Sequence, residues 1–419
     1  MTQENVVDVI DGLVLKAKAA YDQFLSFDQE SIDKIVLAAA TAAVDQHGVL
    51  AELAVQETGR GLFEDKAIKN LYAAEYVKNN IIKTKTVGVI SDDPLTGIIE
   101  IADPVGVIAA LTPTTNPTST TIFKALIALK TRNPIVFGFH PPAQNSSAAA
   151  ARTVYEAAIK AGAPENCILW IEKPSMEATN ALMNHKYVST ILATGGSAMV
   201  KAAYSCGKPA LGVGPGNVPA YVEKSAKIQQ AAYDLVLSKS FDNGMICASE
   251  QAVIIDKEVY AEFVKEIKRY HVYFASKDEK KKLEKLYFGA PLKDVNSHAP
   301  LNAAVVGKPA SWIAKEAGFD VPEDTVIIAA ECDHVGYDEP LTREKLSPVL
   351  AVLKAKSTDD GIDLAKAMVE LNGLGHSAAI HTQSKELAVR FGEEVKAMRI
   401  IWNSPSSFGG IGDVYNAFI

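Results

Sequence analysis

The sequence has few cysteines and no long hydrophobic run. Four of its 419 residues are cysteine, and no two of them form a C-x-x-C pair. A disulfide framework and a cysteine metal site are therefore not expected, and the thiols fit a reducing compartment. No run of about 18 apolar residues occurs, and residues 1–30 lack the basic start and apolar core of a secretory signal. We expect a cytoplasmic protein without a membrane span, and we predict no metal site.

An excess of positive charge is also missing. Lys and Arg number 42 against 50 Asp and Glu, which gives a formal net charge of -8. A nucleic-acid binder needs a cationic surface that displaces counterions from phosphates, so this class of protein is not expected. The one basic run, KDEKKKLEK from Lys277 to Lys285, mixes acids with its lysines. We interpret it as the solvated face of a helix rather than as a phosphate-binding patch.

The sequence does contain enough apolar material for a large folded protein. Hydrophobic residues make up 48% and charged residues 22% of the chain, which is ordinary for a soluble protein that buries a sizeable core. A single hydrophobic core stops growing near about 250–300 residues, and longer chains usually divide. We therefore expect two domains.

The first 80 residues carry apolar side chains at three- and four-residue spacing, which predicts helices. These helices are expected over residues 6–24, 29–46, 48–58 and 61–79. Two β-branched runs then flank the turn from Asp92 to Gly97, which predicts a hairpin over 86–103. A hairpin that projects from an α/β body leaves edge groups unpaired, so we expect it to pair with another subunit in a homo-oligomer.

From Val105 onward, short apolar strands alternate with helices, which predicts a parallel sheet covered on both faces. Such sheets bind ligands at the carboxyl ends of their strands. A second alternating unit follows Gly216. We therefore predict an α/β fold with a Rossmann-type parallel-sheet domain, a second α/β domain and the protruding hairpin. The first sheet's strands are expected at 106–111, 135–139, 168–171 and 188–193, and the second's at 252–255, 325–329 and 349–354.

The segment FDNGMICASEQ, residues 241–251, places Cys247 after a glycine-containing turn and just before a strand. Gly244, Ala248 and Ser249 are small, so backbone N–H groups can come close to whatever the sulfur attacks. A thiolate is a strong nucleophile, and backbone donors beside it can hold the oxyanion of a tetrahedral adduct. Cys247 is therefore the candidate nucleophile, and the alternative is a buried structural cysteine.

The segment LTPTTNPTSTT, residues 111–121, follows the first predicted parallel strand. Pro113 and Pro117 have fixed φ angles and stiffen the loop on either side of Asn116. A prepositioned amide NH₂ group is a good oxyanion donor. Asn116 is the candidate donor, and the alternative is an ordinary Asn-Pro turn before a helix.

Two glycine-rich segments suit a close approach of backbone to another group. In VSTILATGGSAMVKAA, residues 188–203, Gly195 and Gly196 allow a tight turn, and Ser197 is expected to cap a helix whose first amides face a pyrophosphate. This is not the G-x-G-x-x-G pattern, so a structural turn between strand and helix is the alternative. The segment GVGPGNVP, residues 212–219, has three glycines within five residues and contains neither an acid nor a histidine.

In order and spacing, FDNGMICASEQ, TPTTNPTST, ATGGSAMV and GVGPGNVP resemble segments of the aldehyde dehydrogenase superfamily. The resemblance is to its CoA-acylating branch, and within that branch to the aldehyde dehydrogenase part of bifunctional aldehyde/alcohol dehydrogenases. It covers essentially the whole chain. Four ordered motifs between Pro113 and Ser249 are far more specific than any one of them.

The resemblance implies a role for each candidate residue. Cys247 would be the nucleophile, and Asn116 with the backbone N–H of Cys247 would form the oxyanion hole. His376, in GLGHSAAIHT, lies on a segment that lines the family's active site, and a structural loop histidine is the alternative. The residues implied at the NAD site are Thr112, Pro113, His140, Gly195, Gly196, Ser197, Gly214 and Glu344.

Two of the implied cofactor residues carry specific expectations from the resemblance. Glu344, in EKLSPV, takes the place of a glutamate that holds the nicotinamide ribose. His140 stands where hydrolytic relatives carry a lysine for the adenosine ribose, which puts that contact in question. NAD is favoured over NADP as the cofactor.

One departure from the family pattern bears on the reaction. Hydrolytic members carry a glutamate just before their glycine pair, which activates water against the thioester, whereas residues 210–214 of this chain hold no carboxylate. Without a base to activate water, an acyl-cysteine should persist until a better nucleophile such as a CoA thiolate arrives. The predicted reaction interconverts acetaldehyde, CoA and NAD with acetyl-CoA and NADH. The resemblance points to acetyl-CoA reduction as the physiological direction.

The resemblance also assigns the domains. Residues 1–85 and 104–225 would bind NAD, 86–103 would form the oligomerisation hairpin, and 226–419 would carry the nucleophile. The chain ends at Ile419 without a capping element, so we expect a longer protein in which an alcohol dehydrogenase domain is fused to this one. The expected partners are a small aldehyde and an acyl-CoA. Two alternatives remain: a hydrolytic aldehyde dehydrogenase that releases a carboxylate, and a mainly structural subunit of a larger assembly.

Overall fold

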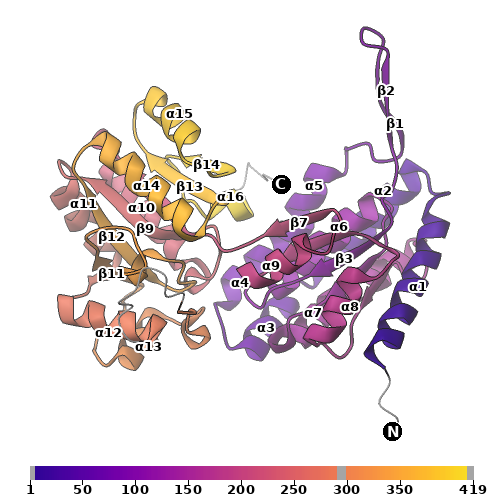
Figure 1. Ribbon diagram of the computed structural model, residues 1–419, viewed down its shortest axis with the longest axis horizontal. Coiled ribbons are helices and arrows are strands. Elements are labelled where there is room, and N and C mark those ends of the chain that lie inside the picture. Colours follow the sequence, from indigo (N-terminus) through magenta and orange to yellow (C-terminus); the bar gives the residue numbers. More distant parts are fainter. Residues whose placement is uncertain (1–4, 290–298, 413–419) are drawn as a thin grey trace. The chain divides into compact units, whose positions relative to one another are not determined.

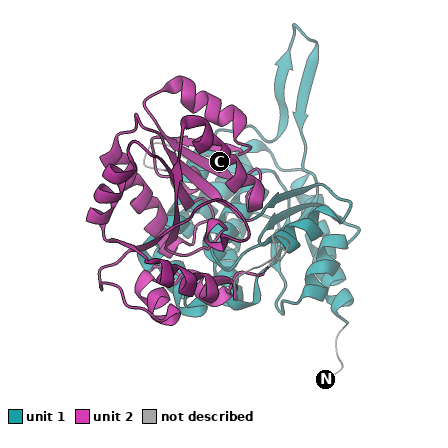
Figure 2. Cartoon of the chain, turned by 60° about the vertical axis from the view of Figure 1, so that its left-hand side comes forward, with its two compact units in different colours: residues 1–59, 63–214, 419 teal, residues 60–62, 215–418 magenta. Residues whose placement is uncertain are grey.

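The computed structural model describes residues 5–289 and 299–412. The chain divides into two compact units, and Figure 2 shows them in different colours. The first unit contains residues 1–59 and 63–214, and the second contains residues 60–62 and 215–418. Each unit has its own sheet and its own hydrophobic core. Within the described ranges, no helix is both long enough and apolar enough to cross a membrane.

The helices at the start of the chain form where the apolar spacing predicts them. Helix α1 buries side chains three or four residues apart, from Ile10 to Phe24, and Asn5 caps its start by accepting the N–H of Val7. Asp28 caps the second helix in the same way. The predicted fourth helix is interrupted by a π-helical segment, Tyr72–Tyr76. The helices are α1 (Val6–Phe24), α2 (Gln29–Asp45), α3 (His47–Thr58), α4 (Phe63–Leu71) and α5 (Val77–Ile81).

The first unit is a five-stranded parallel sheet with strand order β5-β4-β3-β6-β7. Successive residues of β3 face opposite cores: Ile108 and Ala110 pack against α2, α6 and α7, and Ala109 packs against α1 and α8. The strands are β3 (Val107–Leu111), β4 (Ile135–Gly138), β5 (Ile168–Trp170), β6 (Val188–Thr194) and β7 (Ala210–Val213). The helices that follow are α6 (Pro117–Lys130), α7 (Gln144–Lys160), α8 (Met176–Asn184) and α9 (Ser197–Tyr204).

The predicted hairpin is confirmed. Strands β1 (Gly88–Asp93) and β2 (Ile98–Ala102) pair antiparallel, and Figure 1 shows them extending away from the body of the first unit. Asp93 closes the turn by accepting the N–H of Leu95 at 2.8 Å. The hairpin carries exposed apolar side chains: Leu95 is 95% exposed and Ile101 is 67% exposed. An exposed apolar ribbon of this kind is unusual on an isolated chain.

The second unit is a seven-stranded sheet with strand order β10-β11-β12-β9-β8-β13-β14, in which every neighbouring pair is parallel. Helices α12 to α15 contribute to the core on one face, and α10 and α11 to the core on the other. The strands are β8 (Val218–Val222), β9 (Glu250–Asp256), β10 (Val272–Phe274), β11 (Ile327–Glu331), β12 (Val349–Ala355), β13 (Ser377–His381) and β14 (Arg399–Trp402). The helices are α10 (Ile228–Ser240), α11 (Tyr260–Ile267), α12 (Lys277–Phe288), α13 (Ala310–Ala317), α14 (Thr358–Asn372), α15 (Lys385–Glu394) and α16 (Phe408–Ile411).

The α/β class with two parallel-sheet units is therefore confirmed, but the division of the chain lies earlier than residue 225. Strand β8 pairs with β9 and β13, so residues 218–222 belong to the second sheet. From the sequence, the start of this stretch was predicted as part of a glycine-rich segment, and strands β7, β10, β13 and β14 were not predicted. The basic run at residue 277 does form a helix, α12, with a capping box between Ser276 and Glu279. The predicted chain end at residues 416–419 lies outside the described residues.

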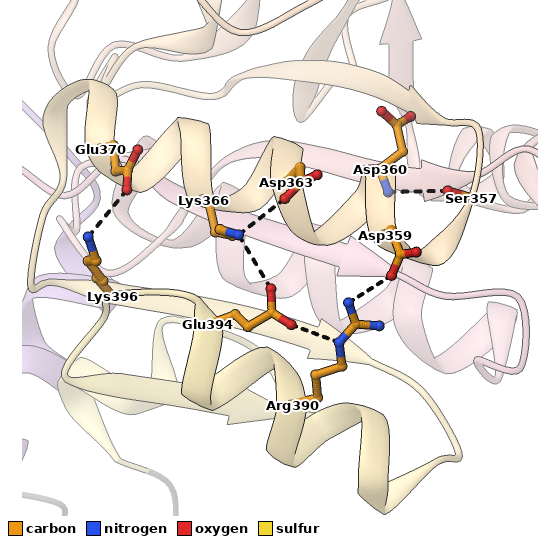
Figure 3. A network of polar contacts seen from close by, with 9 residues as sticks. All are labelled: Ser357, Asp359, Asp360, Asp363, Lys366, Glu370, Arg390, Glu394 and Lys396. Atoms are coloured by element: carbon orange, nitrogen blue, oxygen red, sulfur yellow. Dashed lines mark hydrogen bonds and ion pairs between the residues drawn. The ribbon is translucent and has the colours of Figure 1, made fainter.

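Exposed ion pairs join two helices of the second unit (Figure 3). Arg390 of α15 contacts Asp359 of α14 at 2.7 Å and Glu394 of its own helix at 2.7 Å. Lys366 of α14 contacts Glu394 at 3.3 Å. Because these groups lie in solvent and are screened by salt, the network orients α15 on α14 more than it stabilises the fold.

Candidate active site

The turn before Cys247 is an unusual stretch of backbone. Asp242, Asn243 and Gly244 all have positive φ angles, of 50°, 52° and 67°. Asp, Asn and Gly are the residues that adopt this left-handed conformation at least cost, which explains the sequence DNG. The turn is held in place, because Asp242 accepts the N–H of Leu62 at 2.8 Å and Asn243 donates to the Gly307 carbonyl at 3.1 Å. Consecutive strained residues of this kind cluster at functional sites.

Cys247 lies in the irregular turn that leads from this stretch into strand β9, and its side chain is half-buried. The prediction that it precedes a strand is confirmed. The backbone of Gly216 packs directly against it: a Cβ added at Gly216 would lie 2.1 Å from the carbonyl oxygen of Cys247. The same Cβ would lie 3.1 Å from Cε1 of His376. Three predicted segments of the second unit thus meet at Gly216.

The glycines of GVGPGNVP serve different purposes. Gly216 has no room for a side chain, as described above, and a Cβ at Gly212 would lie 2.7 Å from Cγ1 of Val200. Gly214 follows β7, and no atom lies within 4 Å of its added Cβ. The expectation of close backbone approach is therefore confirmed at Gly212 and Gly216.

We predict that Gly216→Ala lowers both stability and turnover. The added methyl group must displace the backbone of Cys247, which should lower the free energy of unfolding by about 1–3 kcal/mol. A nucleophile shifted by about 1 Å should cost about 10- to 100-fold in kcat. Chemical denaturation and steady-state kinetics measure both effects. Gly392→Ala in α15 is the matched control, since its Cβ would meet its nearest atom at an ordinary 3.6 Å; wild-type behaviour of Gly216→Ala would contradict the close packing.

His376 is buried beside Gly216. Its Nδ1 lies 3.2 Å from Oγ of Ser377, and its Nε2 has no hydrogen-bond partner among the described residues. Burial lowers the pKa of His376 to about 4, and the nearby positive charge of Arg399 acts in the same direction. The imidazole is therefore neutral at pH 7 and has a nitrogen that can accept a proton.

Glu344 contacts the same glycine from another side. Its carboxylate accepts the N–H of Gly216 at 2.7 Å. Burial raises the pKa of Glu344 to about 7, while the Gly216 hydrogen bond and the positive charges of Lys239 and Lys345 oppose that rise. Glu344 is thus held by the segment that packs against Cys247.

Gln251 ties the loop of Glu344 to the strand that follows Cys247. Its side-chain oxygen accepts the backbone N–H of Lys345 at 3.0 Å and the ammonium of Lys239 at 3.3 Å. Its amide NH₂ donates to the Ser249 carbonyl at 3.2 Å, and its own carbonyl accepts from Nζ of Lys345 at 3.0 Å. A buried polar network that is bonded this fully rigidifies its surroundings.

In the first unit, Asn116 occupies the N-cap position of α6, but its side chain makes no capping hydrogen bond. Instead, its Oδ1 accepts from Nζ of Lys69 at 2.7 Å, and its Nδ2 donates to Oγ1 of Thr115 at 3.2 Å. The side chain is half-buried. The amide is therefore oriented by contacts outside the helix that follows it.

The predicted cofactor residues of the first unit lie after the carboxyl ends of neighbouring parallel strands. Thr112 follows β3 and is buried, and its hydroxyl has no partner among the described residues; half-buried Pro113 comes next. His140 follows β4 and is exposed. Gly195 and Gly196 follow β6. The strand order reverses at β3, with β4 on one side and β6 on the other, and such switch points are where open parallel sheets bind ligands.

One detail of this prediction was wrong. Ser197 does not cap α9, because the helix begins at Ser197 itself and Gly196 is the N-cap residue. Gly196 has no side chain that could cap the helix, and no atom lies within 4 Å of its added Cβ. The first amides of α9 remain the feature that suits a phosphate.

The polar residues of α4 were not predicted from the sequence. Lys66, Lys69 and Asn70 are at most 4% exposed, and they share the buried face of this segment with Ala73 and Val77. Their spacing of three and four residues was a signal that could have revealed them, since a lysine on an apolar stripe needs a polar partner.

Comparison with known proteins identifies the family. The model of the aldehyde dehydrogenase family matches residues 2–317. The aldehyde-alcohol dehydrogenase of Streptococcus pneumoniae is 67% identical over 411 residues, which are 98% of this chain and 46% of that protein. The chain belongs to the aldehyde dehydrogenase family. The resemblance stated from its motifs is confirmed, and the chain spans about half the length of that relative.

Solved structures of other aldehyde dehydrogenases have the same fold. An acetylating aldehyde dehydrogenase from Geobacillus thermoglucosidasius has a TM-score of 0.93 and 45% identity, over 98% of this chain and 89% of that one. A propionaldehyde dehydrogenase from Rhodopseudomonas palustris, solved with bound CoA and an acylated cysteine, has a TM-score of 0.84 and 30% identity, over 96% and 89% of the two chains. Asn116 and Cys247 lie inside the residues matched by the family model, and Glu344 and His376 lie beyond them.

Proposed function

We propose that the chain is a CoA-acylating acetaldehyde dehydrogenase that interconverts acetaldehyde, CoA and NAD with acetyl-CoA and NADH. One observation carries the proposal: the segment packed against Cys247 offers no carboxylate that could activate water. Residues 210–214 contain none, and Gly216 meets Cys247 with its backbone alone. The relatives described above as acetylating and as acylated on a cysteine support the same chemistry.

In this mechanism the Cys247 thiolate attacks the aldehyde carbonyl and forms a carbon–sulfur bond. Asn116 and the backbone N–H of Cys247 hold the resulting oxyanion. Bound NAD supplies the hydride acceptor, and CoA supplies the acyl acceptor. The incoming acyl acceptor attacks as a thiolate, which needs no base, and Cys247 leaves as a thiolate when the new thioester forms. Neutral His376 lies beside Gly216 in the lining of this site.

The residues present fit a nicotinamide cofactor. In the first unit, the buried Thr112 hydroxyl lacks a partner among the described residues. Gly196, the N-cap residue of α9, has no atom within 4 Å of its added Cβ, which leaves room for a ligand beside the first amides of the helix. We propose that Thr112, Pro113, His140, Gly195, Gly196, Ser197 and Gly214 contact the cofactor. In the second unit, Glu344, whose carboxylate accepts the Gly216 N–H, would hold the nicotinamide ribose.

An absorbance assay for NADH tests the reaction. With acetaldehyde and NAD, we expect steady-state NADH formation with CoA present, and without CoA no more than about one NADH per Cys247. Analysis of the product should find acetyl-CoA rather than acetate. Equal steady rates with and without CoA, or acetate as the product, would instead establish the hydrolytic alternative.

We further propose that the hairpin β1–β2 associates with a second copy of the chain. Its unpaired edges and its exposed Leu95 and Ile101 support this, because such a surface is costly in water. Light scattering should find an oligomer, and a monomer at every concentration would contradict it. A cytoplasmic location and fusion to an alcohol dehydrogenase domain stay predictions, the latter supported by the name of the Streptococcus pneumoniae relative.

A further inference from the structure

Helix α4 holds the Asn116 loop through three buried polar side chains. Lys66 donates to the Thr115 carbonyl at 3.2 Å, and Lys69 donates to Oδ1 of Asn116 at 2.7 Å. Asn70 accepts the Thr118 hydroxyl at 2.7 Å. The Lys66 contact holds the backbone before Asn116, and the Asn70 contact holds the side chain of Thr118 after it. The contact from Lys69 fixes the side chain itself.

The contact from Lys69 determines which way the amide of Asn116 faces. An ammonium group has three donors and no acceptor, so the atom that faces it must be the carbonyl oxygen of the amide. The NH₂ group is then turned to the opposite side. An amide NH₂ group has two N–H donors. Within the described part of the chain, one of them is donated to Oγ1 of Thr115 at 3.2 Å. The second N–H is the one that can serve a reacting oxygen.

We propose that Lys69 is a positioning residue for the reaction, which sets the orientation of the Asn116 amide and so presents its NH₂ group as the oxyanion donor. This inference rests on the proposed function, in which Asn116 holds the oxyanion. It explains why a lysine that is 4% exposed is kept on the buried face of α4. A charged group is costly to bury, and an apolar side chain would fill the same space without that cost.

The charge of Lys69 adds to the effect of its geometry. A cation on the carbonyl oxygen polarises the amide and makes its N–H groups stronger donors, since hydrogen bonds in a chain strengthen one another. Without Lys69, the two flipped orientations of the Asn116 amide become nearly equal in energy. In one of them the carbonyl oxygen faces the developing oxyanion and repels it.

A double-mutant cycle between Lys69 and Asn116 tests this. The readout is the single-turnover acylation of Cys247 by p-nitrophenyl acetate, measured as release of p-nitrophenolate, which requires neither NAD nor CoA. Lys69→Met should slow acylation about 10- to 100-fold, the loss expected for a hydrogen bond to a charged group. In the Asn116→Ala background, the same substitution should slow it by less than about threefold, because Lys69 then has no amide to orient.

Two further variants keep the test decisive. Lys130→Met removes another buried lysine, which binds Asp33 and the Ile82 carbonyl, and it should lower stability without changing the acylation rate of the folded protein. If Lys69→Met fails to fold, Lys69→Gln replaces it in the cycle. A coupled, less than multiplicative effect supports the inference, and independent multiplicative losses overturn it.

The outcome for Lys69 can be separated from the outcome for the proposed function. Wild-type protein that the ester acylates but that forms no NADH in response to CoA would refute the proposed reaction and leave the cycle measurable. Wild-type protein with CoA-dependent turnover and multiplicative losses would refute the role of Lys69 alone. Wild-type protein that the ester does not acylate would overturn both.

Discussion

Replacing Cys247 with alanine is expected to reduce CoA-dependent NADH formation by roughly 10⁴-fold or more, the loss seen when a covalent nucleophile is removed. Among the described residues at this site, His376 and Glu344 cannot take its place, because an imidazole and a carboxylate do not form the thioester that the reaction needs. The fold should survive, since the side chain is half-buried in a turn and only its sulfur is removed. Kinetics, thermal unfolding and size-exclusion chromatography together measure these expectations.

Cys206→Ala is the matched control for this prediction. Cys206 is also half-buried, and its thiol lies against the Ala202 carbonyl in the first unit. It should keep wild-type turnover. Mass spectrometry of protein stopped in mid-reaction should place the acyl group on the peptide that contains Cys247. Substantial turnover by Cys247→Ala, or an adduct on another peptide, would refute the proposed mechanism. A wild-type protein without turnover, whose chromatography the substitution leaves unchanged, would favour a mainly structural subunit.

Replacing Asn116 with alanine should lower kcat by about 10²–10³, the usual effect of removing one oxyanion donor. KM for the aldehyde should change little, because the donor acts mainly on charge that develops during the reaction. Steady-state kinetics with CoA present measure both constants. A loss confined to KM would mean that Asn116 binds the ground state and does not stabilise the oxyanion.

Asn116→Asp separates the donor from its packing. The carboxylate has nearly the same shape and can keep the contact with Lys69, but it has no N–H to donate. It should therefore lose at least as much activity as Asn116→Ala while staying as stable as the wild type. Activity near the wild-type level in Asn116→Asp would show that the amide N–H groups are not needed.

The sequence predicted those parts of the site whose signal is local. Cys247 follows a glycine-containing turn and precedes an apolar strand, and both features are visible within eleven residues of FDNGMICASEQ. The same holds for Asn116 between its prolines and for the glycine pair before α9. The capping role of Ser197 was wrong by one residue, since helix ends depend on local hydrogen bonds that composition does not resolve.

The contacts that position these groups could not be read from the sequence in the same way. Lys69 and Asn116 are 47 residues apart, and Gly216 and Glu344 are 128 residues apart. Periodicity shows which side chains share a face of a helix or strand. It does not show which partner meets that face.

The sequence by itself determined the α/β class, the hairpin, the candidate residues Cys247 and Asn116, and the strands of the first unit except β7. These follow from hydrophobic period, turn chemistry and motif, which act over a few residues. Tertiary structure alone decided that β8 joins the second sheet, that Gly216 packs against Cys247, and that Lys69 orients Asn116. Those choices depend on which distant surfaces exclude water from one another, and that depends on the packing of the whole unit.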